Sequence, residues 1–420
     1  MSSTLFLSLA ALLLLNVPLA VSIALACILA IVLVSDVPSF VVVQRMFTGL
    51  DSFPLMAIPF FIIAGKIMEV GGISKRLIDF AASIVGSMTG GLAIIAILAS
   101  MFFAAISGSA PATVAAIGSI MVPAMVKAGY DKGFSIALMA VSGTIGVIIP
   151  PSIPFVTYGL TANVSVGNLF VAGVVPGILV GVSLMVYSYF IAKKRGYKGA
   201  EKTSLSKFFR TFKASIWGLL MPIIILGGIY GGFFTPTESG VIACVYGLII
   251  SIFVYREMKP KDLKAVFVDS GLISSMVLLI IATANVMSWI LTTEQVPQKV
   301  AEFVGSFATS ATMLLIFINL VLLIVGTFLE LNAAIIILVP MLMPLIAQFD
   351  INPIHFGVIM IVNLSIGLLT PPLGVNLFVA KSLGDISFNT IVRRVVPFLI
   401  ITIIDLILLT FIPALSIGFL

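Results

Sequence analysis

The sequence contains little charge, one histidine and two cysteines. Only 9% of its 420 residues are charged, against roughly 25% in soluble proteins. Cys27 and Cys244 lie far apart in apolar runs without metal or redox spacing, and the sequence has no G-x-x-x-x-G-K-[ST] loop. These absences argue against a metal centre, a disulfide scaffold and an ATPase. We expect a protein that is not an enzyme, has no cofactor and takes its energy from an ion gradient or a partner.

Long apolar runs fill most of the chain. Hydrophobic residues make up 61% of it, and the mean hydropathy is +1.29. At roughly 20 residues per membrane helix, these runs allow about ten to thirteen crossings or half-crossings. The runs are continuous rather than alternating, which favours helices over a β-barrel. We predict an all-α polytopic membrane protein, with residues 1–34 retained as a membrane helix rather than removed as a signal peptide.

The positive charge is concentrated in one stretch. Eight of the 22 Lys and Arg residues lie between 193 and 213. By the positive-inside rule this stretch predicts a cytoplasmic loop, and we favour that interpretation over a nucleic-acid site. Two apolar segments, 215–231 and 237–254, then return the chain to a second basic run at 256–264. Both basic runs can therefore be cytoplasmic, and the loop between the two segments should face outward.

The basic stretch separates two halves that resemble each other. Residues 145–151 read IGVIIPP and residues 366–372 read IGLLTPP, so the offset is 371 − 150 = 221. The same offset aligns further pairs without a gap: Pro123 with Pro344, Met139 with Met360, Val141 with Val362, and Pro176 with Pro397. We predict a first repeat at 1–192, a cytoplasmic linker at 193–213 and a second repeat at 214–420. The repeats are inverted if each half crosses the membrane an odd number of times.

Each half contains a hairpin followed by a helix with a Pro-Pro pair. The arms of the segments 89–126 and 310–347 are short for spanning, which favours re-entrant hairpins. The segments 130–160 and 353–382 should be broken helices, because proline lacks an amide donor and clashes with the preceding turn. Backbone groups freed in a membrane must line a cavity or bind something. Two amphipathic segments should be interfacial or ordinary connecting helices, at 73–88 and 296–309.

The hairpin tips and helix breaks carry the candidate binding chemistry. Half-helix N-termini suit an anion, whereas free carbonyls and hydroxyls suit Na⁺. In the first half the candidates are Ser107, Gly108, Ser109, Thr113, Gly146, Pro150, Pro151 and Ser152. In the second half they are Gly326, Thr327, Glu330, Gly367, Thr370, Pro371, Pro372 and Asn376. Further candidate oxygens belong to Ser142, Thr144, Asn332, Asn363 and Ser365. Any single hydroxyl among these could instead bond back to its own helix.

Four other polar residues have open or structural interpretations. A carboxylate at membrane depth costs roughly 2.5–3.5 kcal/mol or more, so Glu330 is either functional or placed at an aqueous mouth. Asp405 could pair with a basic group on another helix or lie near a helix end. We expect a structural role for His355. Glu238 should cap the following helix, with Thr235 or Thr237 as N-cap.

Several segments together resemble one transporter family. They are GGISKRL at 71–77, FFAAISGSAPATVAAIGSIMVPAM at 102–125, GTIGVIIPPSIPFVTYG at 143–159, GGFFTPTESG at 231–240 and LLTPPLGVNLFV at 368–379. The chain is similar along its whole length to the large membrane subunit of tripartite ATP-independent periplasmic (TRAP) transporters, the DctM-type permease. The resemblance implies a multi-pass protein of the bacterial inner membrane. It also implies an elevator mechanism, in which a transport domain with two hairpins moves against a scaffold.

The resemblance further implies partners, a coupling ion and a cargo. The partners are a periplasmic substrate-binding protein and a small four-helix membrane subunit, expected here as a separate chain. The cargo is a carboxylate, such as a dicarboxylate, a sialic acid or a sugar acid, imported with Na⁺. Na⁺ would be held through Ser107, Ser109, Thr327, Thr370 and nearby backbone carbonyls, with the substrate between the two sites. A stand-alone symporter that needs no binding protein is the alternative.

Overall fold

The computed structural model describes the chain except residues 16, 86–87, 198–203, 306–307 and 373. Every regular element in the described part is a helix. Eight of these helices are long and apolar enough to cross a membrane, or up to nine if the bent pair within 132–161 counts as one more span. The prediction of an all-α polytopic membrane protein is confirmed. Six shorter apolar helices of 10–17 residues explain why hydropathy alone could not separate crossings from half-crossings.

The prediction of one continuous helix over residues 1–34 is wrong. The chain instead forms two short helices, α1 (Ser2–Leu14) and α2 (Leu19–Val34), which pack against each other. Pro18 is the N-cap of α2. Because proline has no amide donor and its ring clashes with the preceding turn, it ends the first helix and begins the second.

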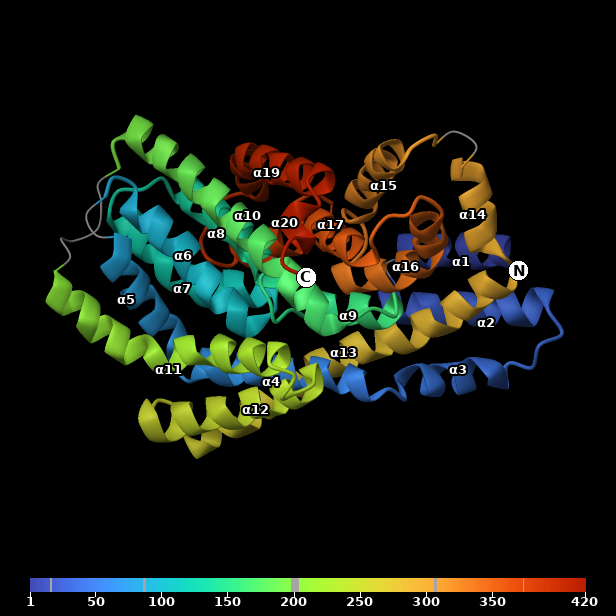
Figure 1. Cartoon of the computed structure of the whole chain (residues 1–420), viewed down its shortest axis with the longest axis horizontal. Coiled ribbons are helices and arrows are strands. Elements are labelled where there is room, and N and C mark those ends of the chain that lie inside the picture. The colour runs from blue at the N-terminus through green and yellow to red at the C-terminus, as the bar shows by residue number, and fades with distance from the viewer. Residues whose placement is uncertain (16, 86–87, 198–203, 306–307, 373) are drawn as a thin grey trace.

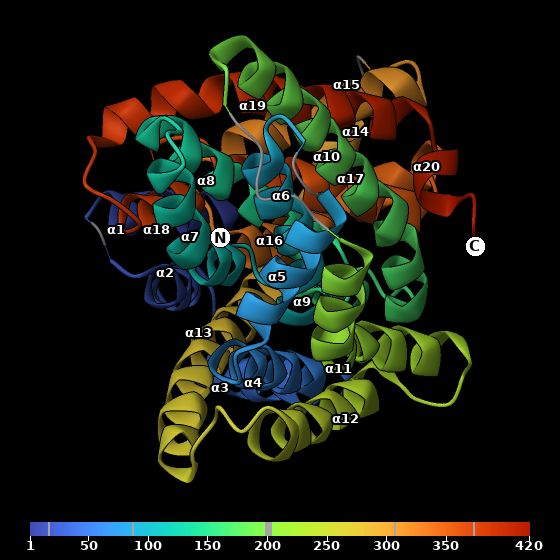
Figure 2. The same ribbon diagram turned by 90° about the vertical axis from the view of Figure 1, so that its left-hand side faces the viewer.

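One group of helices forms a layer at the lower edge of both views (Figure 1, Figure 2). Within it α13 packs on α2, α3 and α4, and α12 packs on α4 and α11. The bounds are α3 (Phe40–Leu50), η1 (Phe53–Met56), α4 (Ala57–Val70), α11 (Leu205–Tyr230), α12 (Pro236–Ile249) and α13 (Pro260–Thr293), with a π-helical turn at Ile250–Val254 after α12. The predicted cap of α12 is confirmed: Thr235 Oγ1 accepts from the Glu238 amide at 3.2 Å, and Glu238 Oε2 accepts from the Thr235 amide at 2.8 Å.

The hairpins and broken helices form the upper layer (Figure 1). The first half contributes α6 (Gly91–Ser107), α7 (Ala110–Lys127), α8 (Lys132–Ile148), α9 (Ile153–Thr161) and α10 (Val166–Arg195). The second half contributes α15 (Ala311–Val325), α16 (Leu331–Gln348), α17 (Pro353–Gly367), α18 (Val375–Lys381), α19 (Phe388–Phe411) and α20 (Ala414–Ile417). The two halves interlock, because α18 packs on α7 and α8, and α16 packs on α9.

Helix bounds in the two halves follow the offset of 221. Added to 110–127 of α7 it gives 331–348, which are the bounds of α16. Added to 132–148 of α8 it gives 353–369, against 353–367 for α17. The amphipathic segments are also helices that match in this way, α5 (Ile73–Val85) and α14 (Val296–Gly305). They lie at opposite ends of the molecule in Figure 1.

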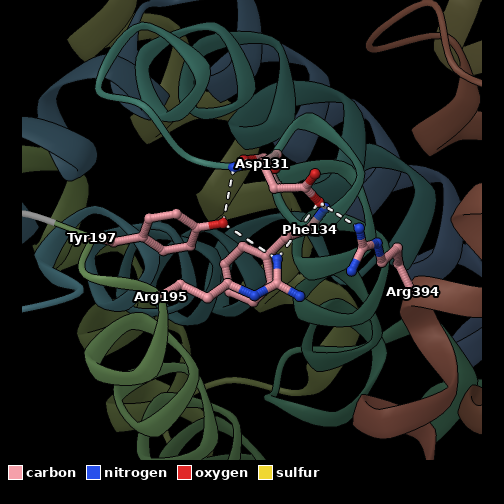
Figure 3. Close-up of polar contacts among 6 residues, drawn as sticks. Asp131, Phe134, Arg195, Tyr197 and Arg394 are labelled. Atoms are coloured by element: carbon pink, nitrogen blue, oxygen red, sulfur yellow. Dashed lines mark hydrogen bonds and ion pairs between the residues drawn. The ribbon is translucent and has the colours of Figure 1, made fainter.

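A charged cluster shows how the matched helices run (Figure 3). Asp131, the N-cap of α8, lies 3.8 Å from Arg195 at the C-terminus of α10 and 3.5 Å from Arg394 near the N-terminus of α19. The end of α10 therefore lies beside the start of α19. α10 and α19, which the offset aligns in sequence, also meet through Ser183 and Asp405, so they run in opposite directions, which is the relation expected of inverted repeats.

Candidate functional site

The tip of the first hairpin is a compact cluster of hydroxyls between α6 and α7. Ser107 Oγ lies 3.1 Å from Thr113 Oγ1, and the Thr113 hydroxyl donates to the Ser109 carbonyl at 2.8 Å. The Ser109 hydroxyl caps α7 by accepting from the Ala112 amide. Gly108 has a φ of 58°, a left-handed conformation that glycine adopts without strain. The fold thus brings the four predicted residues of this tip together.

This tip lies directly on the first broken helix. A Cβ added to Gly108 would lie 2.8 Å from the Pro151 carbonyl oxygen, and one added to Gly146 would lie 2.6 Å from the Ser109 carbonyl oxygen. Such distances leave no room for a side chain at either glycine. The chain bends by 43° between α8 and α9, across the Pro-Pro pair. Hairpin tip, helix and break are therefore in contact through their backbones.

The second hairpin meets the second break in the same way. A Cβ on Gly367 would lie 2.7 Å from Gly326 Cα and would overlap the Gly326 carbonyl. The Asn376 backbone amide closes the break by donating to the Leu368 carbonyl at 3.1 Å. The Asn376 side-chain amide donates to the Ala140 carbonyl of α8, also at 3.1 Å. This bond ties the second break to the broken helix of the first half.

Glu330 begins a chain of hydrogen bonds that crosses between the repeats. Its Oε2 accepts from the Ala333 amide at 3.1 Å and caps α16, while its Oε1 accepts from Asn332 Nδ2 at 2.9 Å. Asn332 Oδ1 accepts from the Thr157 hydroxyl of α9 at 3.2 Å. The carboxylate thus stabilises a helix N-terminus, which neither of the two earlier interpretations included.

Both tips and both breaks surround one central cavity of about 190 Å³. Four predicted residues line it directly: Gly108, Ser109, Glu330 and Asn332. Leu368 and Val375 flank the second break in its wall, and Ile153 follows the first. The lower layer contributes Ile273 and Val277 of α13 to the cavity wall. The cavity therefore lies between the two hairpins and against the opposing layer of helices.

Three buried oxygens near the breaks have no hydrogen-bond partner among the described residues. They are Ser142 Oγ on α8, Asn363 Oδ1 on α17 and Asn376 Oδ1 on α18. The offset of 221 aligns the first two. Buried polar atoms are nearly always paired in native proteins, so each of these oxygens has free capacity for a cation or a polar ligand.

Several predicted hydroxyls donate to carbonyls of their own helix or break. The Thr327 hydroxyl donates to the Ile324 carbonyl and the Thr370 hydroxyl to the Ile366 carbonyl. The Ser152 hydroxyl donates to the Val147 carbonyl at 2.6 Å. The two Pro-Pro pairs also differ, because Pro150 and Pro151 are buried whereas Pro371 and Pro372 are exposed. The matched breaks are therefore not equivalent in their surroundings.

Asp405 and His355 belong to other contacts. Asp405 is buried in α19, six residues before its last residue Phe411, and accepts from the Ser183 hydroxyl of α10 at 2.8 Å; no basic group pairs with it among the described residues. His355 is buried and its Nδ1 lies 2.6 Å from Ser416 Oγ. Within the described part of the chain, no group of three or more His, Cys, Asp or Glu residues could hold a metal ion.

The model of one protein family matches residues 6–415, and its description is the DctM component of tripartite ATP-independent periplasmic transporters. The chain belongs to this family. The DctM family consists of transport proteins, so the chain is a membrane transport component and not an enzyme. It is a multi-pass protein of the bacterial inner membrane.

Relatives in the DctM family differ in the cargo that their names give. The chain is 46% identical over 405 residues to the isethionate permease protein DctMQ of Oleidesulfovibrio alaskensis, covering 96% of this chain and 64% of that protein. It is 45% identical to the C4-dicarboxylate large permease protein of Pseudomonas aeruginosa, covering 89% and 88%. It is 41% identical to the sialic acid large permease protein of Vibrio cholerae, covering 88% and 87%.

The fold also resembles solved transporter structures. The YdaH transporter of Alcanivorax borkumensis superposes with a TM-score of 0.64 at 13% identity, covering 88% of this chain and 86% of that one. At such low identity the likeness concerns the fold alone.

Sequence patterns did not reveal two parts of this DctM site. The hydrogen bond between Thr157 and Asn332 joins residues 175 positions apart. The local sequence around either residue gives no indication of its partner. The α13 wall of the cavity looks like any apolar membrane helix. A four-residue spacing of Ile273 and Val277 is visible, but only the packing of α13 shows what that face contacts.

Proposed function

We propose that the chain is the large membrane subunit of a Na⁺-coupled importer of small organic anions. The central cavity supports this proposal most directly, because both hairpin tips and both helix breaks converge on it. Backbone amides and carbonyls freed at helix breaks are the groups with which secondary transporters bind substrates and ions at membrane depth.

The coupling ion would bind beside the cavity. Hydroxyl and carbonyl oxygens gather at the first tip, around Ser107, Ser109 and Thr113. The free oxygens of Ser142 and Asn363 add neutral ligands at matched places on the two broken helices. Na⁺ is a hard cation that takes such oxygens, so these groups fit the proposed coupling.

The two layers suit an elevator mechanism. The upper layer holds both hairpins and both breaks, and it would move as the transport domain against the lower layer as scaffold. The remaining partners would be a small membrane subunit and a periplasmic binding protein that delivers the cargo. Relatives named for C4-dicarboxylates, sialic acid and isethionate suggest a carboxylate or sulfonate cargo.

The test is uptake into proteoliposomes that contain this subunit and the small subunit. A panel of radiolabelled organic acids is offered with the cognate binding protein and an inward Na⁺ gradient. We expect uptake of at least one acid, lost when K⁺ replaces Na⁺. Uptake that continues with K⁺ and a proton gradient would reject Na⁺ coupling, and uptake without the binding protein would favour a stand-alone symporter.

A further inference from the structure

A second cavity, of about 380 Å³, lies between the two layers. α3, η1 and α13 form its wall on the lower side, and α9 and α16 form its wall on the upper side. Its polar lining is neutral, with six side chains that offer hydroxyl or amide groups: Thr48, Ser52, Thr157, Thr161, Asn285 and Ser288. None of the described lining residues is charged.

One face of α13 connects this cavity with the central one. Ile273 and Val277 line the central cavity, and Ile281 and Asn285 line the second cavity. These four residues follow one another at intervals of four, so they lie on the same face of the helix. The two cavities are therefore consecutive along α13.

A hydrogen bond separates the two cavities. Thr157 lines the second cavity and Asn332 lines the central one. Both side chains are buried, and the Thr157 hydroxyl shares its proton between Asn332 Oδ1 at 3.2 Å and the Ile153 carbonyl at 3.1 Å. Since Asn332 also holds Glu330 at the second hairpin tip, movement of that tip would strain or break this bond.

A positive charge lies near the second cavity, at the end that is farther from the central cavity. The guanidinium of Arg45 on α3 stands over the Trp289 ring at 5.2 Å. Trp289 follows Ser288, and Arg45 precedes Thr48 by three residues on the same face of α3. Arg45 is the only Lys or Arg residue in the first 65 positions. A cation beside a neutral polar cavity attracts anions toward it.

The second cavity lies toward the end of the molecule opposite the basic stretch. α9 ends at Thr161, and α10 begins shortly afterwards at Val166. The 30 residues of α10 then extend over about 45 Å to Arg195. A Cβ on Gly167 would lie 3.2 Å from Ile229, at the end of α11 that precedes the outward loop. By the positive-inside rule, this end faces the periplasm.

We infer that the second cavity is an outer vestibule for a hydroxylated organic anion, closed from the central cavity by the Thr157–Asn332 bond. Arg45 draws in the anionic group, and the neutral lining exchanges hydrogen bonds with the hydroxyls of the cargo. Release of the bond admits the cargo to the central cavity. The inference rests on the proposed transport function, and it adds the route and the residues that select the cargo.

Thiol labelling tests the vestibule. In a background with Cys27→Ala and Cys244→Ala, Ser288→Cys is treated from the periplasmic side with an anionic, membrane-impermeant methanethiosulfonate. Ser275→Cys is the matched control, because it lies on α13 but belongs to an apolar surface pocket. We expect Ser288→Cys to react and to lose at least tenfold in uptake, while Ser275→Cys does neither.

The outcomes separate this inference from the proposed function. A Ser288→Cys variant that transports normally but stays unlabelled from outside would overturn the vestibule and leave the transporter intact. Absence of uptake by the untreated parent would refute the transport function, whereas the labelling pattern could still be read.

A second measurement tests the closing bond. Ile273→Cys reports access to the central cavity. Its labelling rate from outside is measured in three proteins, which carry Thr157, Thr157→Val or Thr157→Ser. We expect a rate about fivefold higher with valine, the effect of one lost hydrogen bond, and an unchanged rate with serine. Equal rates for threonine and valine, with Ser288→Cys still labelled normally in the valine variant, would show that the bond does not close the route.

Discussion

Gly367→Ala should separate the second hairpin from the second helix break. The new methyl group would overlap the Gly326 backbone, which lies 2.7 Å away at its Cα. Because the obstacle is main chain, no change of rotamer can relieve the overlap, and the hairpin must move as a unit. Overpacking of this kind costs about 1–3 kcal/mol.

Gly271→Ala is the matched control. Gly271 is also a helical glycine, on the exposed face of α13, and a Cβ there would meet nothing within 4 Å. Its replacement by alanine should stabilise the helix by about 0.5–1 kcal/mol, because alanine loses less backbone entropy. The two variants therefore differ by about 1.5–4 kcal/mol in the free energy of unfolding, with opposite signs.

Both variants can be compared by thermal unfolding and by uptake. Cys27 and Cys244 are buried free thiols, so a thiol-reactive fluorophore reports unfolding without an engineered cysteine. We expect Gly367→Ala to unfold at a lower temperature than the parent and its uptake to fall, while Gly271→Ala unfolds at a slightly higher temperature and keeps the uptake of the parent. Equal unfolding temperatures and equal uptake for the two variants would refute the argument that backbone contact between tip and break organises the site.

Three further changes have distinct expected outcomes. Asp131→Asn keeps the helix cap but removes the ionic contacts with Arg195 and Arg394. The free energy of unfolding, followed in a thermal scan, should therefore fall by no more than about 1 kcal/mol, and 1 M salt should abolish the difference. Pro151→Ala should lower uptake more than thermal stability, because it lets the first broken helix close; normal uptake here and in the matched variant of the second break would contradict the broken-helix argument. Arg45→Gln should lower the initial uptake rate at low ionic strength and lose that effect at high salt, whereas Arg45→Lys should transport normally; a rate that salt does not alter would argue against steering.

Much of the fold could be predicted from the sequence, because its signals are local. Continuous apolar runs predicted membrane helices, and small residues between short runs at 107–110 predicted a hairpin tip where α6 ends at Ser107 and α7 begins at Ala110. The offset of 221 predicted that two halves would repeat, and the helix bounds follow it closely. The exception at the N-terminus has a local cause too, since Pro18 is the N-cap of α2.

The candidate site was predictable in its backbone and much less so in its side chains. Helices end at both tips and at both Pro-Pro pairs, because glycine and proline act on their own residues and neighbours. The hydroxyls of Thr327 and Thr370, proposed as cation ligands, donate to carbonyls one turn earlier, and their lone pairs remain available to a cation. A hydroxyl in a helix has both options, and no sequence pattern decides between them.

The sequence by itself determined where membrane helices form, where they break and which segments repeat, because each of these follows from hydropathy and from proline chemistry within a few residues. Only the tertiary structure decided which groups meet: Thr157 with Asn332, Ser183 with Asp405, and one face of α13 with both cavities. These contacts depend on how helices pack that are far apart in the sequence. A side chain that bonds to a distant partner has the same local sequence as one that bonds to its own helix.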